Sequence, residues 1–383
     1  MNNDKKNSVV TPKLSIIMTV KNAEKHIEES IESVLKQSLK DIELVIIDGE
    51  SEDKTLSIIE NYQKKDSRIF LYEQEKSGIG AAKNCGIEHA KGEFITFLDA
   101  DDYYIDNEAL EKMYNTAITE NVKVCGAFRS IDIKGKIEKA SLHRALLIGF
   151  PRGRMFYYEN CQYDYHFHSY IYEREMIINS DARFAETSVY DDTHFFIRAM
   201  TAATRFYVVP VELYCYRLHE SYAWNAKKCY EALNSLIDQL QYTSEKKLAI
   251  CHYITIQRIN YEYGDMFQKF IKSGDFRILS LLIKAQENID SKLINEKCSR
   301  KIDDNIISAM DFPNNELYKM NIDGNEVVVL SSLYKMLGLV EDGKYSKSNY
   351  GFTVDDVYNS KTYKVGNAIM WIPKKIVHKL HKK

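Results

Sequence analysis

Short apolar runs alternate with helical patterns through the first 130 residues, and this alternation constrains the fold more than any other feature. Apolar runs typical of buried parallel strands lie at 14–20, 42–47, 69–72, 93–98 and 123–128. Helical patterns fill the intervals, at 23–37, 54–65, 80–90 and 108–120. Repeated strand–helix units predict an α/β fold with a Rossmann-like, mostly parallel open sheet, right-handed crossovers and helices on both faces.

The rest of the chain gives a less regular pattern. We expect a loop at 134–153, a strand over 163–168, a helix at 192–203 and a strand at 206–216. Beyond residue 227, apolar residues recur at helical spacing to about residue 300. The sequence therefore predicts an α/β domain at 1–225 and a mainly helical C-terminal region at 226–383.

Composition excludes several classes of protein. The chain has 45% hydrophobic residues and only 5 prolines and 16 glycines, which indicates a folded globular protein. Its net charge of -3 gives no reason to expect a nucleic-acid partner. Seven scattered cysteines without a C-x-x-C pair favour free thiols, and no signal-peptide pattern or membrane-spanning apolar run is visible, so we expect a cytoplasmic location.

Carboxylates gather where the parallel strands are expected to end. Asp48 closes the second apolar run, and Asp99, Asp101 and Asp102 follow the run at 93–98. Ligands bind at this edge of open parallel sheets, and carboxylates crowded there raise one another's pKa unless a cation neutralises them. Mg²⁺ or Mn²⁺ suits such oxygen ligands. Because aspartate also favours ordinary turns, the Asp-x-Asp tripeptide alone does not define a metal site.

Several segments in this region, taken in order, resemble the family 2 glycosyltransferases of the GT-A fold. They are Ser15–Asn22, Val45–Asp53, Gly80–Gly86, Ala90–Glu93 and Phe97–Asp102. The resemblance covers about residues 13–105, which it makes the donor half of the first domain. It implies transfer of a sugar from a nucleoside diphosphate donor with inversion at the anomeric carbon.

The resemblance also implies a set of donor-site residues, namely Thr19, Val20, Asp48, Lys83, Asp99, Ala100 and Asp101. Asp48 would contact the base, as the N3–H of a uracil, with Thr19 and Val20 near the nucleoside. Asp99 would address the ribose or donor sugar, and Lys83 the sugar or diphosphate. Asp101 would bind Mn²⁺ or Mg²⁺ at the diphosphate, with Asp102 nearby. Gly49 and Glu50 replace a usual aspartate and glycine, so the nucleotide is less firmly implied than the reaction.

A second acidic pair, Asp191 and Asp192, precedes Phe195 and resembles the Glu-Asp-x-x-Phe element of the same family. An inverting transfer needs a carboxylate that takes the proton of the acceptor hydroxyl. We expect Asp192 to be this base, with Asp191 as the alternative. Both acids would also suit a helix N-terminus without any catalytic role.

The segment from Tyr214 to Ser221 resembles a Tyr-Arg-x-x-x-x-Ser element that follows in related enzymes. Arg217 would face the diphosphate, and His219 would be a further metal ligand or a leaving-group contact. Positive charge there would stabilise the departing nucleoside diphosphate. A single histidine is also often a structural residue.

The aromatic segment near residue 165 is a hypothetical acceptor wall. Its residues Tyr163, Tyr165, His166 and His168 would offer rings to a pyranose and polar groups to its hydroxyls. A strand whose rings face the core explains the same pattern.

The C-terminal tail has the pattern of a basic amphipathic helix. Ile369, Ile372, Ile376 and Leu380 recur at helical spacing among lysines, which is typical of contact with an anionic membrane surface. A solvated tail packed on its own domain is the alternative. The sequence leaves open whether the C-terminal helices make a homo-oligomer.

Together these features predict a metal-dependent inverting glycosyltransferase in bacterial surface polysaccharide assembly, with an acceptor and catalytic half at 106–225 and a glycan or lipid-linked acceptor. A sugar-nucleotide pyrophosphorylase would carry a glycine-rich loop after the first strand, whereas residues 19–23 contain no glycine. A catalytically silent glycan-binding or scaffolding subunit is the non-enzymatic alternative.

Overall fold

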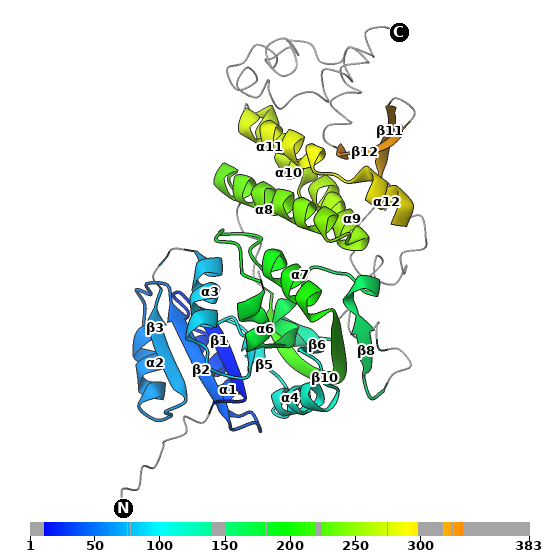
Figure 1. Cartoon of the computed structure of the whole chain (residues 1–383). Coiled ribbons are helices and arrows are strands. Elements are labelled where there is room, and N and C mark those ends of the chain that lie inside the picture. The colour runs from blue at the N-terminus through cyan, green and yellow to red at the C-terminus, as the bar shows by residue number, and fades with distance from the viewer. Residues whose placement is uncertain are drawn as a thin grey trace, which may run out of the picture. The chain divides into compact units, whose positions relative to one another are not determined.

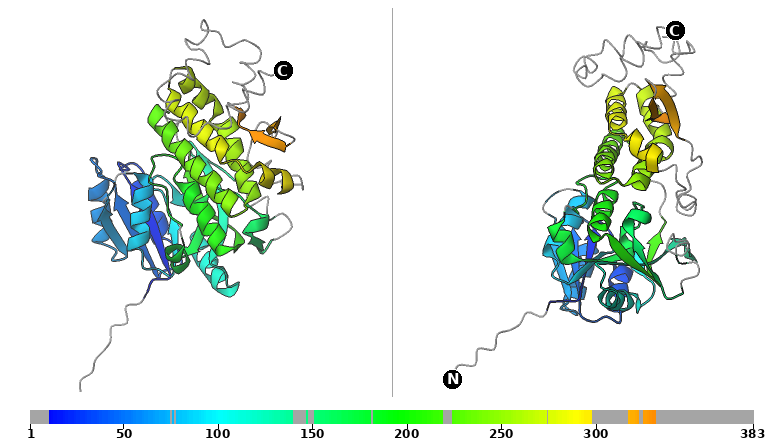
Figure 2. Two further views of the ribbon diagram at one scale, coloured as in Figure 1. Left: turned by 45° about the horizontal axis from the view of Figure 1, so that its top comes forward. Right: turned by 45° about the vertical axis from the view of Figure 1, so that its right-hand side comes forward.

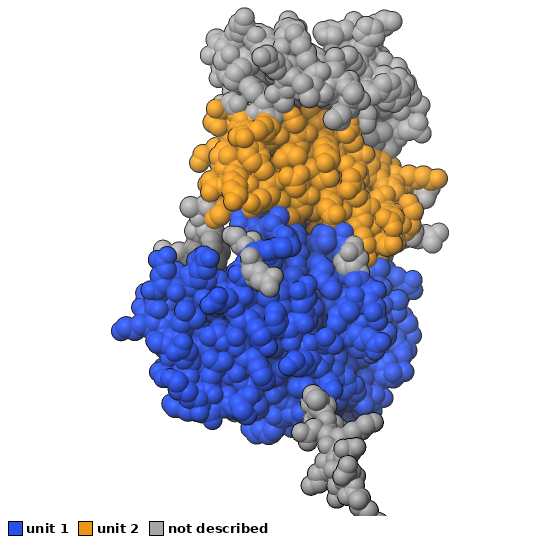
Figure 3. Space-filling view, turned by 60° about the vertical axis from the view of Figure 1, so that its left-hand side comes forward, with its two compact units in different colours: residues 1–222 blue, residues 223–383 orange. Residues whose placement is uncertain are grey.

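The computed structural model divides into two compact units, residues 1–222 and 223–383 (Figure 3). The structure describes residues 11–74, 76, 78–139, 147, 151–180, 182–218, 224–273, 275–297, 317–322 and 325–331. Each unit is considered by itself below.

The first unit contains one large mixed sheet (Figure 1). Its strands are β1 (Leu14–Val20), β2 (Ile42–Asp48), β3 (Ile69–Glu73), β4 (Phe94–Phe97), β5 (Tyr103–Tyr104), β6 (Val124–Ile133), β7 (Lys136–Glu138), β8 (Arg154–Tyr157), β9 (Tyr170–Glu173) and β10 (Arg205–Arg217). The order along the sheet is β3-β2-β1-β4-β9-β6-β10-β5. Strands β3, β2, β1 and β4 are parallel, whereas β9 lies antiparallel between β4 and β6. The predicted mostly parallel α/β sheet is therefore confirmed.

Helices cover both faces of the parallel part of the sheet (Figure 2). The helices of this unit are α1 (Ile27–Leu35), α2 (Thr55–Gln63), α3 (Ile79–His89), α4 (Ala109–Thr119), α6 (Arg174–Asn179) and α7 (Asp192–Ala203), with short 3-10 turns η1 (Tyr158–Asn160) and η2 (Phe167–Ser169). Alternate residues of a strand point to opposite faces. Ile46 accordingly joins the core beneath α1, α2 and α4, while Val45 and Ile47 pack against Ala82 of α3.

The predicted strand over 163–168 is wrong. Residues 162–166 have no regular secondary structure, η2 follows, and the strand β9 begins only at Tyr170. His166 has a left-handed φ of 69°, which interrupts an extended chain. The alternating rings instead serve core packing, since Tyr163 and Phe167 are both buried.

The second unit is mainly helical in its described part. Its elements are α8 (Ala226–Glu245), α9 (Ala249–Gln257), the π-helical turn η3 (Arg258–Glu262), α10 (Gly264–Lys272), α11 (Phe276–Glu287), α12 (Ser291–Lys297), β11 (Tyr318–Ile322) and β12 (Asn325–Val329). The side chains of Asn225 and Asp275 cap α8 and α11, because each accepts a backbone N–H of the first turn. The antiparallel pair β11–β12 was not predicted. No described helix is long and apolar enough to cross a bilayer, and the basic tail at 369–383 lies outside the described residues.

A fully buried histidine links α9 to α8 and to the residue that precedes α12. His252 on α9 contacts the Thr243 hydroxyl of α8 through Nδ1 at 2.8 Å, and its Nε2 accepts the backbone N–H of Asp290 at 2.9 Å. The ring is therefore neutral in this arrangement. Burial lowers the pKa of His252 to about 4.

Acid is expected to destabilise the chain through His252. The folded-state pKa of His252 lies below the ordinary value of 6.5. The stability that the neutral ring contributes is therefore fully present above pH 6.5 and is lost as the pH falls toward 4. We expect the free energy of unfolding to fall by about 2 kcal/mol from this group between pH 7 and pH 5. Urea unfolding at both pH values should show a smaller fall for His252→Gln, and equal falls for parent and variant would contradict this prediction.

Candidate functional site

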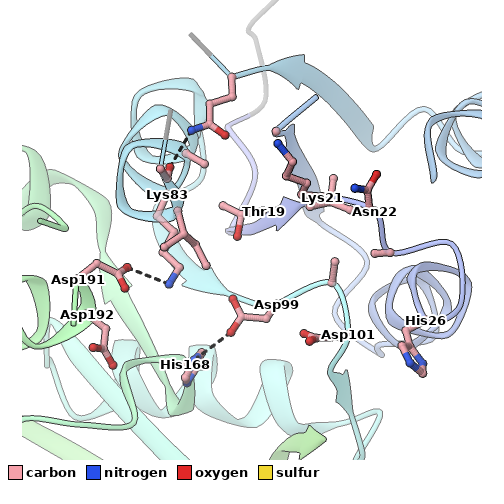
Figure 4. A pocket seen from close by; sticks show the side chains of 18 of the residues that line it. Thr19, Lys21, Asn22, His26, Lys83, Asp99, Asp101, His168, Asp191 and Asp192 are labelled. Carbon is pink, nitrogen blue, oxygen red and sulfur yellow. Dashed lines mark hydrogen bonds and ion pairs between the residues drawn. The ribbon is translucent and has the colours of Figure 1, made fainter. Parts of the chain in front are cut away.

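A cavity of about 920 Å³ opens at the carboxyl ends of β1, β2, β3 and β4 (Figure 4). The N-termini of α3 and α7 form its opposite side. Of the predicted site residues, the cavity is lined by Thr19, Val20, Lys83, Asp99, Ala100, Asp101, His168, Asp191 and Asp192. The structure thus brings the acids that follow β4 and those that begin α7, about 90 residues apart in sequence, to one place.

Asp48 lies at the end of β2, directly before the cavity residues Gly49 and Glu50. Its Oδ2 accepts the backbone N–H of Ser51 at 3.0 Å. Its Oδ1 is buried and has no hydrogen-bond partner among the described residues. A buried carboxylate oxygen without a hydrogen-bond partner raises the free energy of the folded chain. This position therefore suits a ligand that brings an N–H donor.

The two departures from the family pattern have a structural counterpart at the cavity rim. Glu50 takes a left-handed φ of 62°, a conformation that glycine adopts without steric cost. A Cβ added to Gly49 would come within 2.9 Å of the Gln74 side-chain oxygen. Glu50 therefore holds a strained backbone conformation, whereas a side chain at position 49 would require only the Gln74 side chain to shift.

Lys83 and Asp191 form a buried ion pair on the cavity wall. The Lys83 Nζ lies 3.1 Å from Asp191 Oδ2, and the two side chains are only 5% and 10% exposed. The ammonium also lies over the rings of Phe167 and Phe184, at 4.6 and 5.1 Å from their centroids. Burial opposes the charged amine, but the nearby carboxylates of Asp191, Asp99 and Asp192 outweigh it and raise the pKa of Lys83. Lys83 is therefore a fixed cation beside the cavity.

Asp99 is held by His168, whose ring lies beside it in the cavity wall (Figure 4). The His168 Nε2 lies 3.3 Å from Asp99 Oδ2. Burial lowers the pKa of His168, so a neutral ring donates its N–H to the carboxylate. For Asp99, burial alone would raise the pKa, yet Lys83 and His168 reverse this effect and hold the pKa well below its usual range. Asp99 is therefore a carboxylate.

Arg217 does not line the cavity. Its guanidinium donates to the backbone carbonyl of Asp101 at 2.7 Å, pairs with Glu29 and stacks over the ring of Tyr103. The predicted contact with a diphosphate is therefore not supported by this geometry, because the guanidinium is engaged by Asp101, Glu29 and Tyr103 and does not line the cavity. His219 lies outside the described residues.

Three residues of the hypothetical acceptor wall lie away from the cavity. Tyr163 is fully buried, with its hydroxyl bonded to that of Tyr170 and its ring against Phe196, so it packs the core and offers no surface to an acceptor. Tyr165 and His166 are half-buried and do not line the cavity, and His166 contacts the guanidinium of Arg129 at 2.9 Å. Among the four, His168 alone lines it.

Sequence reasoning missed part of the lining. The unassigned residues are Lys21, Asn22, Ala23, His26, Gly49, Glu50, Gln74, Lys76, Gly78, Ile79, Ala82, Phe167 and Tyr216. Several of them directly follow a predicted parallel strand, so the rule that ligands bind beyond strand ends would have found them. His26 precedes α1 and has no comparable sequence signal.

Gly80 allows α3 to approach the loop before α7. A Cβ at this position would lie 1.9 Å from the backbone oxygen of Ala185 and 3.2 Å from the Cβ of Asp191. Because a backbone atom cannot move aside cheaply, Gly80→Ala is expected to destabilise the chain by about 1–3 kcal/mol. Urea unfolding measures this change. Gly264→Ala is the control, because a Cβ there would approach the backbone oxygen of Ile259 only to 3.3 Å, and equal losses would contradict the prediction.

Comparisons with known proteins agree with this architecture. Residues 15–179 match the model of glycosyl transferase family 2. The uncharacterized glycosyltransferase EpsJ of Bacillus subtilis is 29% identical over 216 residues, which cover 54% of this chain and 61% of the relative. A GalNAc(5)-diNAcBac-PP-undecaprenol beta-1,3-glucosyltransferase of Campylobacter jejuni is 44% identical over 93 residues, 24% of this chain and 30% of the relative. The chain thus spans less than two thirds of these relatives.

The solved structure of S. aureus TarS 1-349 in complex with UDP-GlcNAc superimposes with a TM-score of 0.58 at 18% identity, over 83% of this chain and 97% of that one. Similarity at this identity shows the fold. The family match over residues 15–179 confirms the predicted resemblance for that segment, and the predicted GT-A fold is confirmed.

Proposed function

We propose that the protein is an inverting glycosyltransferase that moves a sugar from a UDP-linked donor to a hydroxyl of a glycan or lipid-linked acceptor. The observation that carries the proposal is the cavity in which Lys83, Asp99, Asp101 and Asp192 meet at the carboxyl ends of the parallel strands. That edge is where open α/β sheets bind nucleotides. Its size suits a nucleotide sugar, since pockets for ligands of that size measure about 300–1,000 Å³.

The uracil would bind at the end of β2. Asp48 supports this assignment because its buried Oδ1 has no partner among the described residues and can accept an N–H such as that of uracil N3. The adjacent cavity residues Thr19 and Val20 would lie beside the nucleoside. TarS has been solved with UDP and with UDP-GlcNAc, which supports a UDP-linked donor.

A divalent ion, Mn²⁺ or Mg²⁺, would be held by Asp101. Asp99 and Asp101 line the same wall of the cavity, which fits ions that take one or two protein carboxylates and complete their shell with phosphate and water. Among the described residues, no three His, Cys, Asp or Glu side chains gather closely enough to form a metal site without a substrate. When bound, the ion would offset the negative charge of the departing diphosphate.

Asp192 would act as the general base. Both acids line the cavity, and we assign the role of base to Asp192 because Asp191 is held in the buried ion pair with Lys83. The acceptor hydroxyl would lose its proton to Asp192 as its oxygen bonds to the anomeric carbon and the bond to the diphosphate breaks. Lys83 would keep the charge of Asp191 balanced and orient the start of α7.

The acceptor would be a surface glycan or a lipid-linked oligosaccharide. The Campylobacter jejuni relative is named for an undecaprenol-linked acceptor, which supports a lipid-linked substrate. Such an acceptor would bring the enzyme to the inner face of the cell membrane, where the basic residues of the C-terminal tail would help to hold it. A homo-oligomer remains compatible with this proposal.

Turnover of a panel of nucleotide sugars with Mn²⁺ tests the proposed function. We expect slow hydrolysis of one UDP-sugar, with release of UDP and a sugar whose first-formed anomer, observed by NMR, is inverted. Tight UDP binding without any turnover, on the panel or with added glycan acceptors, would favour a silent binding subunit. Turnover restricted to other nucleotides would overturn the assignment of Asp48.

A further inference from the structure

A single tyrosine hydroxyl spans the loop that carries Asp99 and Asp101. Tyr214 of β10 is fully buried. Its hydroxyl accepts the backbone N–H of Asp99 at 3.4 Å and donates to the side-chain Oδ2 of Asp102. The same segment is closed by a turn, in which the N–H of Asp102 donates to the carbonyl of Asp99 at 3.0 Å. Both ends of the loop are thus attached to one side chain of a distant strand.

Asp102 is attached to the same strand at a second point. Its side chain is buried, does not line the cavity, and its Oδ1 accepts the backbone N–H of Arg217 at 2.7 Å. Burial and the nearby charge of Asp99 raise the pKa of Asp102 to about 8, while the hydrogen bonds from Tyr214 and Arg217 oppose this shift. Ser30 of α1 adds a bond of 2.8 Å to the carbonyl of Ala100.

Tyr214 also supports the carboxylate of Asp99 through His168. The rings of Tyr214 and His168 lie 4.7 Å apart at an angle of 32°. His168 in turn contacts Asp99 Oδ2. Tyr214 therefore contacts both the backbone of Asp99 and the residue that orients its side chain.

We propose that Tyr214 and Asp102 are positioning residues, whose shared hydrogen bond fixes the loop so that Asp99 and Asp101 face the donor. This inference rests on the proposed function. Neither residue lines the cavity, so each would act through the aspartates and not by touching substrate. A displacement of about 1 Å in a catalytic site can lower a rate about 100-fold. A fixed loop would therefore keep Asp99 and Asp101 in the geometry that the reaction needs.

Tyr214→Phe and Asp102→Asn, singly and combined, test the proposal. Tyr214→Phe keeps the ring on His168 but removes the bridge between Asp99 and Asp102. Tyr158→Phe is the matched control, because Tyr158 is equally buried and its hydroxyl donates to a backbone carbonyl, that of Tyr163, at 2.7 Å away from this loop. The measurements are kcat and KM for UDP-sugar turnover, the thermal midpoint, and hydrogen–deuterium exchange of a peptide covering 98–104.

Each single variant is expected to lower kcat/KM about 10- to 100-fold, while its thermal midpoint stays near that of Tyr158→Phe. Because both changes act on the one hydrogen bond that the two residues share, the double variant should fall no more than about threefold below the slower single variant. Exchange at 98–104 should be at least about tenfold faster in Tyr214→Phe than in the control.

Parent-like kcat/KM in Tyr214→Phe, losses that multiply in the double variant, or unchanged exchange at 98–104 would overturn the inference. A parent protein that neither binds UDP nor turns over any donor would overturn the proposed function instead. The exchange experiment still decides in that case whether Tyr214 and Asp102 fix the loop.

Discussion

Asp192→Asn is expected to lower the rate of sugar transfer about 100- to 10,000-fold, the range associated with loss of a general base. The amide keeps the size of the side chain at the start of α7, but it cannot take a proton from the acceptor hydroxyl. Binding of UDP should stay within about twofold of the parent, since Asp192 is assigned to the acceptor side. Steady-state kinetics and calorimetry with UDP measure the two effects separately.

Two variants control this experiment. Asp66→Asn removes a carboxylate that pairs with Arg68 in the turn before β3, outside the cavity, and should leave kcat unchanged. Asp191→Asn frees Lys83 and should disturb stability more than Asp192→Asn does, because it breaks the buried pair. Full activity in Asp192→Asn, together with a large loss in Asp191→Asn at equal stability, would move the role of base to Asp191.

Lys83→Met should lower the free energy of unfolding by about 3–5 kcal/mol, because it leaves the buried carboxylate of Asp191 without its partner. The variant also loses the contact of the ammonium with the rings of Phe167 and Phe184. Combining it with Asp191→Asn removes the stranded charge and should recover part of the loss. Urea unfolding, followed by circular dichroism, measures all three variants.

Lys36→Met is the matched control for Lys83→Met. Lys36 pairs with Glu32 across one turn of α1, but the two side chains are 60% and 43% exposed. Solvent screens such a pair, so its removal should cost less than about 1 kcal/mol. A loss in Lys83→Met as small as that of Lys36→Met would show that the buried pair does not stabilise the start of α7.

The half of the sheet around β1 was predictable because its strands are buried on both faces. A strand of that kind is a continuous apolar run, and Leu14–Val20 and Ile42–Asp48 appear in the sequence as such. Helix α7 was predicted with its observed bounds, Asp192–Ala203, since acids at its first turn mark the start. Strand β9 was missed because it has only four residues, Tyr170–Glu173, and its place between β4 and β6 is decided by tertiary pairing.

The candidate site was predictable where side chains follow a strand directly. Asp99 and Asp101 are examples, since strand direction alone carries them to the ligand edge. Arg217 was expected to face the diphosphate, but in the structure it does not line the cavity. Its orientation depends on Glu29 and Tyr103, which are remote in sequence. The aromatic pattern near Tyr163 was ambiguous from the start, since core rings and sugar-binding rings have the same composition.

A crystal structure of the chain with UDP and Mn²⁺ tests the central claim most directly, because the anomalous signal of manganese locates the ion independently of the nucleotide. We predict that the uracil N3–H lies within hydrogen-bond distance of Asp48 Oδ1, and that manganese joins the diphosphate to Asp101. Nucleotide bound outside the cavity between β1, β4 and α3, or manganese away from Asp101 with UDP in place, would contradict the account.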